Sequence, residues 1–122
     1  MTDYAAARRN MVLSQLEPNR VNDIRILGAM GSIPREVFAP KSLAGVAYID
    51  EDLEIAPGRY LMEPMVLGRL IEALAIESGD LVLNVGCATG YAAAVLTQLA
   101  GTVVAVESDA DLVARAGDNL AK

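Results

Sequence analysis

The stretch Leu81–Gly90, which reads LVLNVGCATG, decides the fold that the sequence predicts. Residues 81–85 form a short apolar run typical of a strand that is buried on both faces of a parallel sheet. The small residues at 86–90 predict a tight turn in which the backbone approaches a ligand closely, because larger side chains would keep the ligand away. The stretch therefore predicts the first strand and the binding turn of a nucleoside-binding βαβ unit.

The residues that follow predict the rest of this unit. A helix is expected over 90–100, a second buried strand over 102–106, and a last helix over 110–121 with Asp109 as its N-terminal cap. Glu107 ends the second strand, where nucleotide-binding units place an acidic side chain that accepts hydrogen bonds from both ribose hydroxyls. This order of elements indicates an α/β fold with parallel strands.

A dinucleotide site is the main alternative for this turn. Its fingerprint is G-x-G-x-x-G/A, but here Ala88 stands at the second glycine position and Tyr91 at the third. A side chain as bulky as Tyr91 impedes the close packing of helix and pyrophosphate that a dinucleotide requires. S-adenosylmethionine has no pyrophosphate, so the turn favours it over a nicotinamide dinucleotide.

The first half of the chain predicts helices and loops. Helices are expected over 2–16 and 23–30, with Arg8 on the solvent side of the first, and a short helical turn over 35–39. Pro64 suits the first position of a further helix, which should continue to about residue 77, because the missing N–H of proline costs nothing there.

The chain has 122 residues, which indicates one domain. We divide it into a helical and loop extension, 1–63, and the start of a Rossmann-like ligand-binding unit, 64–122. The hydrophobic fraction is 53% and the mean hydropathy +0.34. A chain this small cannot bury so much apolar surface alone. We therefore expect an exposed apolar face that meets another copy of the chain or a missing part of it.

Charge and composition exclude several kinds of partner. The net charge is −6, and Lys and Arg form no cluster, which argues against a nucleic-acid surface. No apolar run is long enough to span a bilayer, and the N-terminus lacks the pattern of a signal peptide. The chain has no histidine and one cysteine, Cys87, which makes a zinc site unexpected and fits a reducing, cytoplasmic compartment.

Five segments resemble one known family, the protein-L-isoaspartate O-methyltransferases. Residues 82–91 resemble its motif I, and residues 104–107 resemble the acidic strand end that follows. Motif I is shared by many methyltransferases, but residues 22–30, 33–40 and 47–50 are similar to this family's own N-terminal extension. The resemblance implies a class I methyltransferase fold of which the chain carries the N-terminal portion.

The resemblance also implies a cofactor and a reaction. The cofactor would be S-adenosyl-L-methionine, and the substrate a protein or peptide whose isoaspartyl carboxylate attacks the donor methyl, a step in protein repair. A carboxylate is already ionised at pH 7, so no general base is required. The residues expected to bind the cofactor are Asn84, Gly86, Cys87, Ala88, Gly90, Tyr91 and Glu107.

The sequence departs from the family's pattern at four positions. Asn84 stands where the family usually has Asp or Glu, and Ala88 replaces a usual glycine, a mild change provided that φ there is below zero. Met62 takes the place of a serine hydroxyl, and Glu63 adds a negative charge where an anionic substrate approaches. Both changes should weaken isoaspartate binding unless Arg59 offsets them. No catalytic residue is assigned, and a non-catalytic cofactor-binding or protein-interaction module stays open as the alternative.

Several single residues have plainer interpretations. Cys87 is expected to be a small buried side chain, and Tyr91 to cover the cofactor or to pack at the helix start. Arg35 and Glu36 are expected to form a surface ion pair or to anchor a loop. The acidic residues of 50–54 are expected to be solvated.

Members of the resembling family have a sheet of about seven strands, whereas this chain predicts two of the core strands. We therefore expect a truncated or partial chain that is inactive alone and self-associates through its apolar faces and unpaired strand edges.

Overall fold

The computed structural model describes residues 2–121. The regular elements in chain order are α1 (Tyr4–Met11), α2 (Ile24–Ser32), β1 (Leu53–Ala56), β2 (Arg59–Leu61), α3 (Pro64–Ala73), β3 (Leu81–Val85), α4 (Tyr91–Thr97), β4 (Thr102–Val106) and α5 (Ala110–Leu120). Short helical segments lie between them: a π-helical turn at Val12–Leu16 and 3₁₀ turns at Glu17–Asn19, Arg35–Phe38 and Lys41–Val46. No helix among residues 2–121 is long and apolar enough to cross a membrane.

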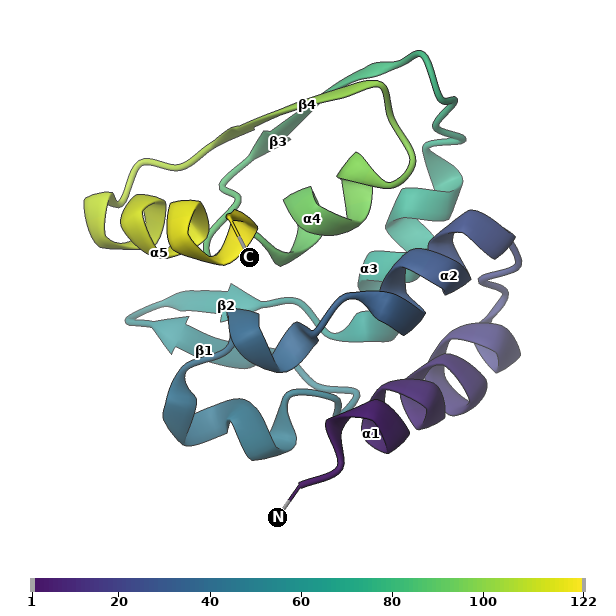
Figure 1. Ribbon diagram of the computed structural model, residues 1–122, viewed down its shortest axis with the longest axis horizontal. Coiled ribbons are helices and arrows are strands. Elements are labelled where there is room, and N and C mark those ends of the chain that lie inside the picture. The colour runs from purple at the N-terminus through teal and green to yellow at the C-terminus, as the bar shows by residue number, and fades with distance from the viewer. Residues whose placement is uncertain (1, 122) are drawn as a thin grey trace.

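The second half of the chain is the βαβα unit that the sequence predicts. β3 and β4 pair in parallel, with Leu81 opposite Thr102 and Val85 opposite Val106. Figure 1 shows α4 and α5 on the same side of this two-stranded sheet. Asp109 caps α5, because its carboxylate accepts hydrogen bonds from two backbone N–H groups of the first turn. The predicted α/β fold class is confirmed.

The opposite face of this sheet is open, which contradicts the expectation of strands buried on both sides. Its apolar side chains are Leu81, Leu83, Val85, Val104 and Val106. Leu81 is 71% exposed and Val85 is 72% exposed. Within the part of the chain that the structure describes, Figure 1 shows no layer above this face. The composition predicted an exposed apolar surface, and this face supplies it.

The first half of the chain packs against this unit through one continuous core. β1 and β2 form an antiparallel hairpin, with Leu53 opposite Leu61. One cluster of buried side chains joins α1, α2, the hairpin, α3, α4 and α5; it includes Met11, Met30, Phe38, Leu61, Leu67, Tyr91, Val95 and Leu112. The predicted extension and the predicted ligand-binding unit therefore share a core.

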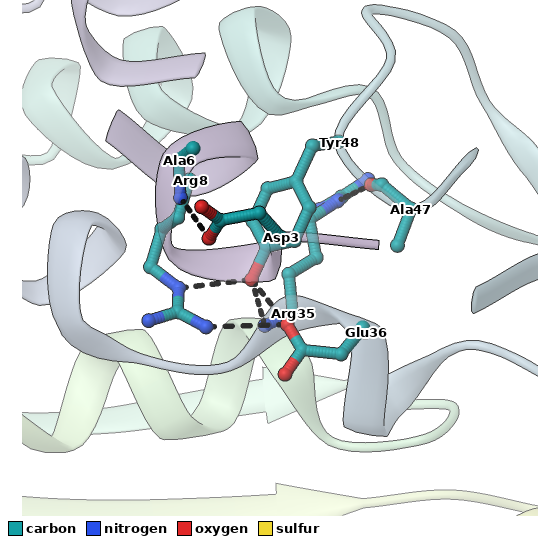
Figure 2. A network of polar contacts seen from close by, with 7 residues as sticks. All are labelled: Asp3, Ala6, Arg8, Arg35, Glu36, Ala47 and Tyr48. Carbon is teal, nitrogen blue, oxygen red and sulfur yellow. Dashed lines mark hydrogen bonds and ion pairs between the residues drawn. The ribbon is translucent and has the colours of Figure 1, made fainter. Parts of the chain in front are cut away.

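A buried tyrosine hydroxyl ties α1 to the loop after α2. Figure 2 shows Arg8, Glu36 and Tyr48 converging from three segments. The Tyr48 hydroxyl accepts from Arg8 Nε and from the Arg35 backbone N–H, both at 2.9 Å, and donates to Glu36. Burial, and then the Glu36 carboxylate, raise the pKa of Tyr48 to about 12. Arg8, expected in solvent, is part of this network and lies 3.2 Å from Glu36.

Arg35 anchors two loops from inside the core. It is 0% exposed, and it donates from Nε to the Ala47 carbonyl at 2.6 Å and from Nη2 to the Met62 carbonyl at 2.9 Å. Its guanidinium stacks on the Tyr91 ring, 4.8 Å from the centroid. Burial lowers the pKa of Arg35. The loop-anchor interpretation is confirmed, whereas a surface ion pair with Glu36 is wrong.

Some element boundaries differ from the expected ones. α3 begins at Pro64 as predicted but ends at Ala73, four residues early. The backbone leaves the helix because Ala75 has a φ of 50°, and the Asp80 carboxylate accepts from the Glu77 backbone N–H at 2.8 Å in the turn that follows. The final part of the first predicted helix is the π-helical turn at Val12–Leu16.

Candidate functional site

The Glu107 carboxylate is the centre of the candidate site. It directly follows β4, and its side chain is 1% exposed. Oε1 accepts from the Ala88 backbone N–H at 2.8 Å, and Oε2 from the Asp109 backbone N–H at 2.9 Å. The Arg59 guanidinium donates to both oxygens, from Nη1 to Oε2 at 2.8 Å and from Nη2 to Oε1. Four donors thus converge on one carboxylate.

These donors keep Glu107 ionised. The Arg59 guanidinium, and then the Asp109 N–H, lower the pKa of Glu107 to about 2. The carboxylate is therefore an anion at neutral pH, and both of its oxygens act only as hydrogen-bond acceptors.

The turn from β3 into α4 brings its backbone to this carboxylate. Gly86 has a φ of 69° and Gly90 a φ of 98°, a region that glycine enters without strain. The N–H groups of Gly86 and Cys87 both donate to the Val106 carbonyl, at 2.8 and 3.0 Å, which pins the turn to the end of β4. The turn is therefore held by the neighbouring strand before any ligand arrives.

Ala88 departs from the sequence-based expectation. Its φ is 52°, so the condition under which the loss of glycine would be mild does not hold. A side chain in this left-handed region costs on the order of 1 kcal/mol, because its Cβ crowds the following carbonyl oxygen. The strain is offset locally by the hydrogen bond from the Ala88 N–H to Glu107.

An open pocket of about 440 Å³ lies above this turn. It is lined by Arg59, Val85, Gly86, Val106, Glu107 and Ser108. Of the residues predicted to bind a cofactor, Gly86 and Glu107 line this pocket. Ala88 does not line it, but its backbone N–H donates to the Glu107 carboxylate. The carboxyl ends of both parallel strands meet here, which is where open α/β sheets bind ligands.

The structure places the other predicted residues behind the pocket. Tyr91 is 1% exposed and packs edge-on against Phe38, with ring centroids 5.5 Å apart. Cys87 is buried, as expected, and burial raises the pKa of its thiol. Asn84 Oδ1 is buried with no hydrogen-bond partner among residues 2–121. Gly90 lies against Leu120 of α5, 3.3 Å from where a Cβ would stand.

Met62 and Glu63 lie between β2 and α3, outside the residues that line this pocket. The Met62 carbonyl accepts from Arg35, and the Glu63 backbone N–H donates to Asp52 at 2.8 Å. Asp50 likewise accepts from the Met65 N–H at 3.4 Å. The acidic residues of 50–54 are exposed, as expected, and two of them also accept from N–H groups at the start of α3. Burial and the nearby Asp50 raise the pKa of Glu63.

Sequence reasoning missed the pairing of Arg59 with Glu107 and the place of Ser108 in the pocket. Arg59 and Glu107 are 48 positions apart, and no local pattern links them. The Arg59 side chain reaches Glu107 from the start of β2, across the fold.

The residues present fit a nucleoside-containing cofactor. Glu107 supplies a two-oxygen acceptor, and Gly86 has nothing closer to the place of a Cβ than the Arg59 guanidinium, at 3.8 Å. The backbone at Gly86 is thus open to close approach from the pocket side.

Known relatives point to the same family. Residues 7–122 match the protein family described as protein-L-isoaspartate(D-aspartate) O-methyltransferase. A protein-L-isoaspartate O-methyltransferase of Methylorubrum extorquens is 46% identical over 110 residues, covering 90% of this chain and 48% of that protein. One from Anaeromyxobacter sp. is 44% identical over 115 residues, covering 94% and 47%. The chain therefore spans about half the length of these curated relatives.

Solved structures agree on the fold. A protein-L-isoaspartate O-methyltransferase matches with a TM-score of 0.78 at 27% identity, over 93% of this chain and 38% of that one. A Plasmodium falciparum protein in complex with S-adenosyl-L-homocysteine matches with a TM-score of 0.71 at 19% identity, over 98% of this chain and 56% of that one. By sequence and by fold, this chain belongs to the protein-L-isoaspartate(D-aspartate) O-methyltransferase family.

Proposed function

We propose that this chain is the cofactor-binding portion of an S-adenosylmethionine-dependent methyltransferase that acts on isoaspartyl carboxylates of proteins or peptides. The observation that supports it most is the buried, ionised Glu107 carboxylate at the end of β4, beside the open backbone of Gly86. In a member of this family, that pair fits the ribose of the cofactor.

The chain's own residues would bind and orient the reactants. Glu107 would accept hydrogen bonds from the two ribose hydroxyls, and Gly86 would let the nucleoside lie against the backbone. S-adenosylmethionine supplies an activated methyl group when bound. The attacking isoaspartyl carboxylate is ionised at pH 7, so holding it in line with the methyl group carries much of the catalysis.

The substrate side of the site differs from the family's pattern. Met62 offers no hydroxyl, and its carbonyl is already taken by Arg35. Groups other than a hydroxyl at this position would then have to orient the substrate. We also propose a cytoplasmic location, which the single unpaired cysteine, Cys87, supports.

Methyl transfer from radiolabelled S-adenosylmethionine tests the proposed function. The substrates are an isoaspartyl peptide and the same peptide with ordinary aspartate, and the enzyme is both the 122-residue chain and the longest available form of the protein. We expect transfer to the isoaspartyl peptide only, by the longest form and not by the 122-residue chain alone, and we expect Glu107→Ala to abolish it. A cofactor-binding protein that methylates neither peptide in either form would contradict the substrate assignment.

A further inference from the structure

Arg59 occupies the acceptor positions that the ribose would need. A carboxylate has about four lone-pair sites on its two oxygens. On Glu107 the Ala88 and Asp109 N–H groups take one site on each oxygen, and the Arg59 guanidinium takes one more on each. No acceptor position is left for two ribose hydroxyls while all four donors are in place.

Arg59 is the donor that can leave. The Ala88 N–H belongs to the turn that is pinned to the Val106 carbonyl next to it, and the Asp109 N–H belongs to the residue that caps α5. Arg59 is a flexible side chain at the start of β2, 32% exposed, and it lines the open pocket beside Gly86. Its guanidinium therefore lies in the volume that the nucleoside would enter.

We propose that Arg59 is a displaceable plug of the nucleoside site, a residue that must release Glu107 before the cofactor's ribose can bind. This inference rests on the proposed function, because it takes Glu107 as the ribose acceptor. The plug satisfies the carboxylate in the unliganded chain, and the bidentate Arg59–Glu107 pair competes directly with the ligand. Arg59 thereby lowers the affinity for the cofactor instead of raising it.

The test compares ligand affinity in wild type and Arg59→Ala by calorimetric titration with S-adenosylhomocysteine and, separately, adenosine. Removal of the Arg59 side chain should raise the affinity for both ligands by on the order of threefold to tenfold, since a partly exposed ion pair no longer has to be broken. Arg59→Lys keeps the positive charge but cannot donate to both carboxylate oxygens at once. Its affinity for each ligand should lie between those of wild type and Arg59→Ala. In a Glu107→Gln background the effect of Arg59→Ala should disappear.

Arg115→Gln is the matched control. Arg115 also holds the hairpin, by donating to the Ile55 carbonyl at 3.2 Å, but it does not contact Glu107. Its loss should leave both affinities unchanged. A similar change in Arg115→Gln would assign the effect to hairpin mobility and overturn the plug.

Other outcomes separate the plug from the proposed function. If wild type binds the ligands and Arg59→Ala binds them equally or more weakly, Arg59 is not a plug, but the cofactor site remains supported. Weakening for S-adenosylhomocysteine alone would show that Arg59 holds the ligand's amino-acid carboxylate, which also overturns it. Absence of binding in wild type, Arg59→Ala and Arg59→Lys alike removes the cofactor site and the plug together.

Discussion

At the scale of single residues, Ala88 is a position of the candidate site where the side chain conflicts with the backbone conformation. Its φ of 52° places a methyl group in a conformation that glycine adopts freely. Family resemblance identifies Ala88 as a replacement for glycine, but only the structure gives the sign of φ and hence the energetic consequence. The turn keeps its shape because Gly86, Cys87 and Ala88 all donate to the end of β4 or to Glu107.

Ala88→Gly should therefore stabilise the chain. We expect the free energy of unfolding to rise by about 0.5–1 kcal/mol. This is the gain from relieving the left-handed strain, reduced by the extra conformational freedom that glycine gives the unfolded state. Ala94→Gly, in the middle of α4, should instead lower it by about 1 kcal/mol. Urea unfolding measures both, and equal losses in the two variants would show that Ala88 is not strained.

Glu107 gives a second test at this scale, through pH. Its folded pKa of about 2 lies below the ordinary value of 4.5, so its carboxylate stabilises the fold above pH 4.5 and this contribution is lost as pH falls toward 2. The difference in unfolding free energy between wild type and Glu107→Gln should therefore shrink as pH is lowered below 4.5. A difference that stays constant over this range would contradict the depressed pKa.

At the scale of elements, the two parallel strands could be predicted more closely than the β1–β2 hairpin or the helix ends. β3 and β4 match the expected ranges residue for residue, because each is a mostly apolar run between a glycine and an acidic residue, with Asp80 before the first and Glu107 after the second. The end of α3 could not be predicted, since the left-handed residue that stops it is Ala75 and not glycine. The Tyr48 network joins residues 12 to 40 positions apart, beyond any local pattern.

Tyr48→Phe tests how much that network holds the first half of the chain together. The change leaves the Arg35 backbone N–H and Arg8 Nε without their acceptor, while Arg8 Nη2 keeps Glu36 (Figure 2). It should cost about 2 kcal/mol of unfolding free energy. Tyr60→Phe is the control, because Tyr60 is 55% exposed and should cost close to nothing. Chemical denaturation measures both, and equal small effects would show that water replaces the hydroxyl.

At the scale of the whole molecule, the turn and the carboxylate of the candidate site could be predicted from the sequence. The arginine that pairs with this carboxylate could not. Gly86 and Glu107 follow from the strand–turn–helix–strand pattern, whereas Arg59 reaches them only through tertiary packing. Composition likewise predicted exposed apolar surface without placing it. The structure places it on the open face of the β3–β4 sheet, in a chain that spans about half the length of its curated relatives.

This open face should make the 122-residue chain self-associate. Contiguous exposed apolar side chains and unpaired strand edges favour pairing between copies. Leu83→Lys combined with Val104→Lys, two exposed positions that lie opposite each other, should shift the chain toward monomer with little loss of stability. The control is Leu70→Lys, which lies on α3 and is 52% exposed, and it should not change the proportion of monomer. Sedimentation velocity across a concentration series measures the association state of each variant. A wild-type chain that stays monomeric at every concentration would contradict this expectation.

In the proposed function, the end of β4 holds the nucleoside of S-adenosylmethionine through Glu107. The most direct test is calorimetric titration of this chain with S-adenosylhomocysteine, in wild type and in Glu107→Ala. We expect saturable one-to-one binding by wild type and at least a tenfold weaker affinity in the variant, about 1.4 kcal/mol or more, because two hydrogen bonds to a charged acceptor are lost. Equal affinity in the two proteins would show that the ligand does not depend on Glu107 and binds elsewhere.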